Sequence, residues 1–225
     1  MKITYHSHSF VQIENDSVSI LIDPFITGNP ASKISKGDIS RCNYIVLTHG
    51  HSDHYGDTDY LAKKFNATVI ATFELAEYAA SRGLKSHQLN IGGGFNFPFG
   101  KVRLTIAHHS SSAPDGRYAG EAAGVLINMD GKVIYHSGDT SLFEDMRNIG
   151  KFNKIDYAFL PIGDNFTMGI DEAVKAAEYI NAATTIPIHY NTFDLIKADA
   201  EDFSRKVKSI GGNCVIMKPE DVIQI

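Results

Sequence analysis

Three histidines and one aspartate within six residues constrain this chain more than any other feature of its sequence. His49, His51, Asp53 and His54 form the pattern His-x-His-x-Asp-His directly after the apolar segment 44–48. Residues two apart in an extended segment point the same way, so His49 and His51 can bind one cation together. Asp53 and His54 follow where the chain turns, and they can reach a second cation nearby. Two adjacent divalent ions of this kind form a hydrolytic centre.

A solvated, histidine-rich loop is the alternative interpretation of this run. The chain has ten histidines in 225 residues, so some clustering is expected. Random placement would produce the four-residue pattern on the order of once in a thousand chains of this length. We therefore interpret the run as a metal-binding motif.

The spacing of apolar residues predicts a chain of mixed α and β structure. Strands are predicted at 2–5, 10–14, 18–22, 44–48, 68–71, 101–107, 122–128, 132–135, 156–161, 185–188 and 214–217. Helices are predicted at 57–65, 73–81, 171–180 and 198–210. No linker or repeat interrupts the pattern, so we predict one domain over residues 1–225. Two strand-rich blocks, each followed by helices, suggest two sheets packed face to face with helices outside.

Charge and cysteine content exclude several classes of protein. The net charge is −5 and no block of like charges is present, so nothing indicates binding to nucleic acid or to a membrane surface. No apolar run approaches the length of a membrane span, and the first ten residues do not read as a signal peptide. Cys42 and Cys214 each lie beside a strand-like segment and make no disulfide framework. We therefore expect a protein of the reducing cytoplasm.

Segment 47–54, Leu-Thr-His-Gly-His-Ser-Asp-His, resembles the ligand motif of the metallo-β-lactamase superfamily. Three later motifs occur in the same order as in that superfamily: Ala-His-His-Ser-Ser at 107–111, Ser-Gly-Asp-Thr at 137–140 and Pro-Ile-His-Tyr at 187–190. The chain is more closely similar to a compact bacterial and archaeal group of metal-dependent hydrolases, in segments 5–9, 21–25, 29–30 and 163–169. The resemblance implies an αββα sandwich with the metal site at one edge, between the sheets.

The resemblance also implies two divalent metal ions held by seven residues. These are His49, His51 and His109 for the first ion, Asp53, His54 and His189 for the second, and Asp139 as the bridge. Such donors suit Zn²⁺, which we predict, and also Mn²⁺ or Fe²⁺. A di-iron oxidoreductase of this fold would be expected to carry glutamate at position 51. His51 therefore favours hydrolysis over redox chemistry.

Two neighbouring histidines compete for the ligand position that follows segment 101–107. Strand alternation places His108 on the face of Val102 and Leu104, where a histidine with satisfied core contacts belongs. His109 precedes the Ser-Ser pattern of the family, so we predict His109 as the ligand.

The roles of three other polar residues are open at this stage. Asp139 could be a turn residue after Gly138 instead of a bridging ligand. Asp23 either orients a ligand imidazole, as the resemblance implies, or belongs to a simple Asp-Pro turn. His8 lies by resemblance at the cavity edge, where it could donate to substrate or shuttle a proton, and the alternative is a buried strand histidine. His8 and Asp53 are the predicted catalytic residues.

The predicted activity is hydrolysis of a small molecule by a hydroxide that bridges the two metals. Two ions contribute about +4, and Asp53, Asp139 and hydroxide offset about 3 of these charges. A site with a small positive charge favours an anionic or strongly polar substrate such as a lactone, thioester or phosphoester. The alternatives are a phosphodiesterase or nuclease, which the negative net charge disfavours, and a non-catalytic metal-binding sensor module. The sequence leaves open the substrate, a homo-oligomeric state, and the roles of His6, Asp164, Asn165 and Met168.

Overall fold

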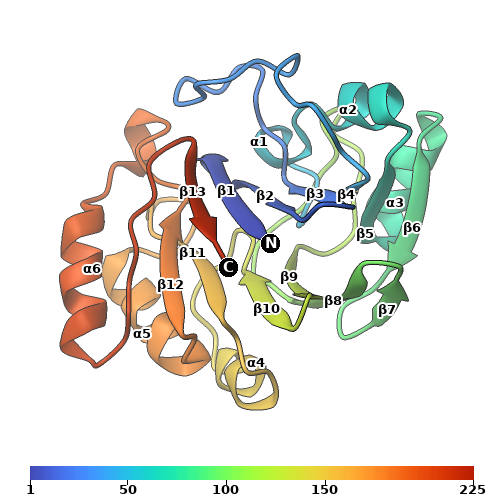
Figure 1. Cartoon of the computed structure of the whole chain (residues 1–225). Coiled ribbons are helices and arrows are strands. Elements are labelled where there is room, and N and C mark those ends of the chain that lie inside the picture. The colour runs from blue at the N-terminus through green and yellow to red at the C-terminus, as the bar shows by residue number, and fades with distance from the viewer.

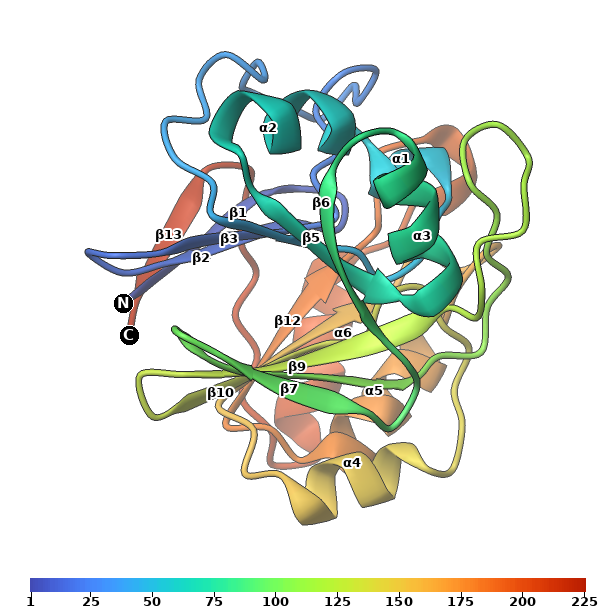
Figure 2. The ribbon, with the colours of Figure 1, turned by 90° about the vertical axis from the view of Figure 1, so that its right-hand side faces the viewer.

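Two mixed β-sheets pack face to face in the computed structural model, which describes residues 1–225, and helices cover both outer faces (Figure 1, Figure 2). The first sheet has the order β13-β1-β2-β3-β4-β5-β6 and comprises β1 Lys2–Ser7, β2 Phe10–Glu14, β3 Ser19–Ile22, β4 Tyr44–Val46, β5 Thr68–Thr72, β6 Lys85–Leu89 and β13 Asp221–Gln224. The second has the order β12-β11-β10-β9-β8-β7 and comprises β7 Gly94–Phe97, β8 Gly100–Ile106, β9 Ala123–Met129, β10 Lys132–His136, β11 Tyr157–Pro161 and β12 Thr184–Ile188.

The helices form the two outer layers of the sandwich (Figure 2). Those on the first sheet are α1 Ser52–Tyr55, α2 Thr58–Phe65 and α3 Phe73–Ser81. Those on the second sheet are α4 Met146–Phe152, α5 Ile170–Ile180 and α6 Ala200–Ser209, and a short 3₁₀ turn, η1 Asp194–Ile196, precedes α6. The predicted αββα sandwich of the α+β class is therefore confirmed.

Alternation along the strands divides the apolar residues between the inner and outer layers. In β9, Val125 and Ile127 face the core between the sheets, where they join Ile13 and Ile20 of the first sheet. Leu126, between them in sequence, packs under the helices of the second sheet. Full burial of one such side chain stabilises the fold by roughly 1.5–3 kcal/mol. Because both faces of the central strands are buried, the register of the sheets is strongly specified.

The carboxyl ends of six strands meet at one edge of the sandwich. β1 and β3 are both antiparallel to β2, and β4 is parallel to β3, so these three strands of the first sheet run in the same direction. In the second sheet β8 and β10 are both antiparallel to β9, and β12 is parallel to β10 through β11. The segments that follow these six strands therefore converge, and they contain the predicted site residues.

Two elements near the C-terminal half differ from the sequence prediction. The final strand is β13, which pairs antiparallel with β1 and brings the chain ends together (Figure 1), and not the predicted segment 214–217, where Cys214 forms only an isolated bridge with Thr185. β13 was missed because its residues are mostly exposed and its partner strand is remote in sequence. Helix α4 was also missed, since its seven residues bury only Met146 and Ile149 and show little periodicity.

The two cysteines lie in different layers of the sandwich. Cys42 lies in the outer layer of the first sheet and Cys214 in that of the second, so they are buried, free and far from pairing. None of the helices combines the length and the apolar character needed to cross a bilayer.

Candidate metal centre

The site lies at the edge where the six strands end. A polar side chain follows each of these strands: His8, Asp23 and His49 on the first sheet, and His109, Asp139 and His189 on the second. The turn from β4 into α1 adds His51, Asp53 and His54. Backbone hydrogen bonds join the two sheets here, from Ala123 N to Thr48 O over 2.9 Å and from His189 N to His8 O over 2.8 Å. The sandwich therefore holds both halves of the site in fixed register.

The structure brings the predicted ligands together in two groups. Side-chain donor atoms of His49, His51 and His109 lie within 4.8 Å of one another, as do those of a second group, His8, Asp53, His54 and His189. His49 Nε2 and His51 Nδ1 are 3.0 Å apart. Three converging imidazoles, and a separate group of histidines with one carboxylate, are donor sets that divalent transition metals prefer.

Asp139 lies between these two groups. Its Oδ2 is 3.1 Å from His189 Nε2 and 3.7 Å from His109 Nε2, and its Oδ1 is 3.3 Å from His54 Nε2. One carboxylate thus contacts a member of the first group and two members of the second. This geometry suits a carboxylate shared by two adjacent cations.

Several buried atoms of the site have no hydrogen-bond partner within the protein. His54 Nε2, Asp139 Oδ1 and His189 Nε2 are all enclosed and unsatisfied. Buried polar atoms without partners are costly and rare in folded proteins. Because both histidine nitrogens lie beside the Asp139 carboxylate, a bound cation would satisfy these atoms, and the residues present fit the predicted metals.

Asp23 orients two of the predicted ligands. Its fully buried carboxylate accepts hydrogen bonds from Thr48 N at 2.8 Å, from Thr48 Oγ1 at 2.6 Å and from His54 Nδ1 at 2.7 Å. Since the Thr48 hydroxyl donates its proton to Asp23, it accepts from His49 Nδ1, 3.0 Å away. Both imidazoles therefore carry their proton on Nδ1 and turn the Nε2 lone pair into the site.

His8 contacts Asp53 from the buried side of the site. Its ring is fully enclosed, with Nε2 3.1 Å from Asp53 Oδ2 and Nδ1 2.9 Å from Thr192 Oγ1. Phe25 and Phe193 pack edge-on against the ring. Because a carboxylate accepts, His8 Nε2 is the donor and His8 Nδ1 accepts from the Thr192 hydroxyl. His8 therefore lies behind Asp53 and does not face the open side of the site.

The pKa values of the site residues fall into two classes. Burial lowers the pKa of His49 well below its usual range, and burial together with His189 lowers the pKa of His8 to about 4. Burial alone would also lower the pKa of His189, but the adjacent Asp139 carboxylate raises it to about 9. Asp139 and Asp23 likewise raise the pKa of His54 well above its usual range. The negative potential is therefore concentrated around His54 and His189, where a bound cation would take the place of protons.

Three site residues have backbone angles in the left-handed region. The φ angles are 56° at His8, 48° at Asp23 and 53° at His189, each directly after a strand. This conformation is uncommon for residues other than glycine, and such residues cluster at functional sites. It turns each side chain from the strand direction into the edge of the sandwich.

A family described as "Beta-lactamase superfamily domain" matches residues 19–190, well over half of the chain. The chain belongs to the metallo-β-lactamase superfamily. It is 51% identical over 217 residues to a UPF0173 metal-dependent hydrolase of Bacillus cereus (strain B4264), with 94% of this chain and 95% of that protein covered. It is also 51% identical over 215 residues to a UPF0173 metal-dependent hydrolase of Anoxybacillus flavithermus (strain DSM 21510 / WK1), with the same coverage.

A solved structure is similar to this chain in both fold and sequence. Igni18, a metallo hydrolase from the archaeon Ignicoccus hospitalis, matches with a TM-score of 0.92 and 36% identity, covering 99% of this chain and 97% of that one. Together these similarities identify the protein as a metal-dependent hydrolase of the metallo-β-lactamase superfamily.

The fold of this metallo-β-lactamase superfamily member corrects one sequence prediction and adds two residues. His108 is exposed and packs against Phe143 instead of facing the core with Val102 and Leu104, because the strand ends at Ile106 and alternation ends with it. His109 is the histidine that reaches the site. Thr48 and Thr192 were not singled out from the sequence. Only their hydrogen bonds to site histidines reveal them.

Proposed function

We propose that this protein binds two divalent ions, with Zn²⁺ preferred and Mn²⁺ or Fe²⁺ as alternatives, and hydrolyses a small anionic substrate. The observation that carries the proposal is the pair of ligand groups, which share Asp139. His49, His51 and His109 hold the first ion, and Asp53, His54 and His189 hold the second. The two buried, unpaired cysteines support a cytoplasmic location.

When bound, two such ions act as Lewis acids and lower the pKa of a shared water to about 7. The chain itself prepares the ligand geometry. Asp23 and Thr48 fix the tautomers of His54 and His49, so both present a lone pair without reorganisation. His8 holds the Asp53 carboxylate from behind.

The charge of the site favours an anion. Two divalent ions contribute about +4, and Asp53, Asp139 and a hydroxide offset about 3 of this. Asp23 adds a further negative charge, but it is fully buried behind His54, away from the open side of the site. The two ions would therefore keep a small positive charge toward the substrate. A lactone, a thioester and a phosphoester are the substrate classes that we propose.

Replacing His8 by alanine is expected to leave the metal content unchanged and to lower kcat by about 10- to 100-fold, the usual effect of losing a partner of a ligand. The physical reason is that Asp53 loses the donor that holds its carboxylate. Thr192→Val removes the hydroxyl that sets the His8 tautomer and should also lower kcat. Thr192→Ser keeps a hydroxyl at this position and should keep the wild-type kcat. Kinetics and elemental analysis of the three variants measure this.

Either of two other outcomes would contradict this role of His8. Unchanged turnover in His8→Ala would make His8 a packing residue of the strand end. Loss of one metal ion per chain would make His8 a ligand of the second ion, which its position within the second donor group permits.

The test of the proposed function is metal stoichiometry by elemental analysis, combined with hydrolysis of a thioester, a lactone and a phosphodiester. We expect about two ions per chain and activity on one of these substrate classes. A chain that stays metal-free when supplied with Zn²⁺, Mn²⁺ or Fe²⁺ would refute the proposal. Cleavage of a test RNA that His51→Ala abolishes would instead establish the nuclease alternative.

A further inference from the structure

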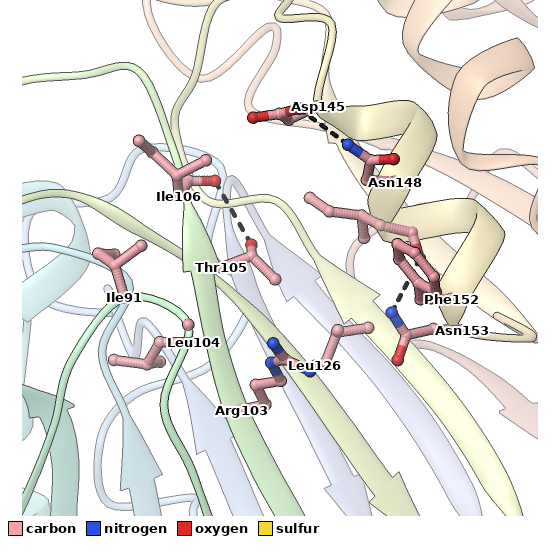
Figure 3. Close-up of a pocket in the computed structure, with 12 residues that line it drawn as sticks. Ile91, Arg103, Leu104, Thr105, Ile106, Leu126, Asp145, Asn148, Phe152 and Asn153 are labelled. Carbon is pink, nitrogen blue, oxygen red and sulfur yellow. Dashed lines mark hydrogen bonds between the residues drawn. The ribbon is translucent and has the colours of Figure 1, made fainter.

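A groove lies on the outer face of the second sheet, away from the metal centre. It has a volume of about 470 Å³ and runs between β8 and β9 on one side and α4 on the other (Figure 3). A second cavity of about 210 Å³ shares Arg103, Leu126 and Asn153 with it, so the two form one continuous groove along the sheet. Lys101 and Arg103 on the outer face of β8 are exposed, whereas Leu126 of the neighbouring β9 is buried in the cluster that includes Met146 and Ile149 of α4.

Much of the lining of this groove is apolar. Leu126 and Ile149 are buried in its floor, whereas Ile106 is 38% exposed and Phe152 is 75% exposed. Figure 3 shows Ile106 on the strand side and Phe152 on the helix side. A phenylalanine this exposed beside a concave apolar surface is typical of a ligand site more than of a solvated helix end.

Basic side chains line the groove where the two cavities meet. Arg103 lines both cavities, and it is the one arginine among six whose side chain has neither an ion pair nor a hydrogen bond. Lys101 lies two residues away on the same face of β8 and lines the second cavity. Lys151 and Lys154 flank the groove residues Phe152 and Asn153, and both are exposed.

None of these three lysines forms an ion pair, in contrast to several lysines elsewhere on the surface. Asp145 is the one carboxylate that lines the groove, and it accepts a hydrogen bond from Asn148 Nδ2 at 2.9 Å. Lys101 and Arg103 therefore line the groove together with this one carboxylate, in a chain whose net charge is −5. Unpaired cations gathered around a concave surface attract an anion.

We propose that this groove binds a single-chain anionic amphiphile, a molecule with an alkyl chain and a carboxylate or phosphate head. The chain lies against Leu126, Ile149 and Phe152, and the head accepts hydrogen bonds from the guanidinium of Arg103. A volume of about 470 Å³ is within the range of small-molecule sites. A planar membrane would leave such a concavity unfilled, so one enclosed molecule fits the groove better than a lipid surface does.

The test uses decanoate, kept below its micelle concentration, titrated calorimetrically into the full chain. We expect saturable binding at one site, with Arg103→Gln weakening it by about tenfold or more because a charge-assisted hydrogen bond is lost. Phe152→Ser should weaken binding as well, and decyltrimethylammonium, with the same chain and a cationic head, should not bind. Lys208→Gln is the matched control, since Lys208 is also an unpaired cation but lies on α6, and it should change nothing.

Arg103 and Phe152 are both exposed, so their variants should fold, which circular dichroism checks. Amide chemical-shift changes on adding decanoate should map to residues of β8, β9 and α4. Dodecyl phosphate replaces decanoate in a second series of titrations. The probe that binds more tightly shows whether the groove prefers a phosphate or a carboxylate head group. No saturable binding of either probe would overturn the proposal. So would equal binding by Arg103→Gln, or binding only to vesicles that contain phosphatidylglycerol, which would make the face a membrane contact.

Discussion

Asp139→Ala is expected to reduce the metal content from about two ions per chain to one or none, and to abolish hydrolysis. Asp139 contacts His54, His109 and His189, so its loss removes the carboxylate that both ligand groups share. We expect kcat/KM to fall by more than about 100-fold, the upper end for residues that only orient a ligand. Elemental analysis and steady-state kinetics on the same preparation measure both effects.

Asp16→Ala is the control for this variant, because Asp16 is exposed and its side chain has no partner in the structure. It should retain both metal content and turnover. If Asp139→Ala also retained its metal content and turnover, Asp139 would be a turn residue after Gly138. Its position between the two ligand groups would then contribute nothing to metal binding or catalysis.

Asp23→Ala is expected to lower the free energy of unfolding of the metal-free protein by about 3–5 kcal/mol, the cost of removing one partner from a buried ion pair. The carboxylate is fully buried and accepts hydrogen bonds from Thr48 N, Thr48 Oγ1 and His54 Nδ1. Alanine leaves the Thr48 amide and the His54 ring without acceptors. The φ of 48° at this position adds strain for any residue with a side chain, but that strain is present in the wild type too. Urea unfolding measures the loss.

The same substitution should also lower the affinity for the second metal ion more than the affinity for the first. His54 loses the acceptor that fixes its tautomer directly, whereas His49 is affected only through Thr48. Asp23→Asn is the informative companion, because its amide oxygen can still accept from Thr48 N while its NH₂ group cannot accept from His54 Nδ1. It should recover part of the stability but not the affinity for the second ion. Equal loss of both ions in Asp23→Asn would contradict this division.

The local spacing of the chain predicted much of the site. His49, His51, Asp53 and His54 are neighbours in sequence, so the turn that follows β4 places them together whatever the rest of the fold does. The sequence predicts a helix at Phe73–Ser81 that ends before Gly83, and α3 has these bounds. Gly83 has a φ of 77°, which suits the glycine that follows a helix. Such features depend on contacts within a few residues, and a pattern in the sequence records them.

Contacts between distant segments were not predictable in the same way. His8 could be placed near the site by resemblance, but its contact with Asp53 and its hydrogen bond to Thr192 join residues far apart in the chain. The strand β13 needs β1 as a partner, which lies at the opposite end of the sequence. His108 was misplaced because strand alternation ended earlier than the sequence indicated.

The sequence by itself indicated a metal-binding motif and a chain of mixed α and β structure, since donor spacing and apolar periodicity are properties of short stretches of chain. The specific αββα sandwich and the order of the ligand segments followed from the resemblance to the metallo-β-lactamase superfamily. The tertiary structure alone decided which polar atoms meet. It placed Asp139 between the two donor groups, and it put Asp23 and Thr48 behind the imidazoles. It also placed Lys101 and Arg103 in the lining of one groove, although no run of positive charge exists in the sequence. The physical reason is that a sheet joins strands side by side, so charges and ligands many residues apart become neighbours only when the strands pair.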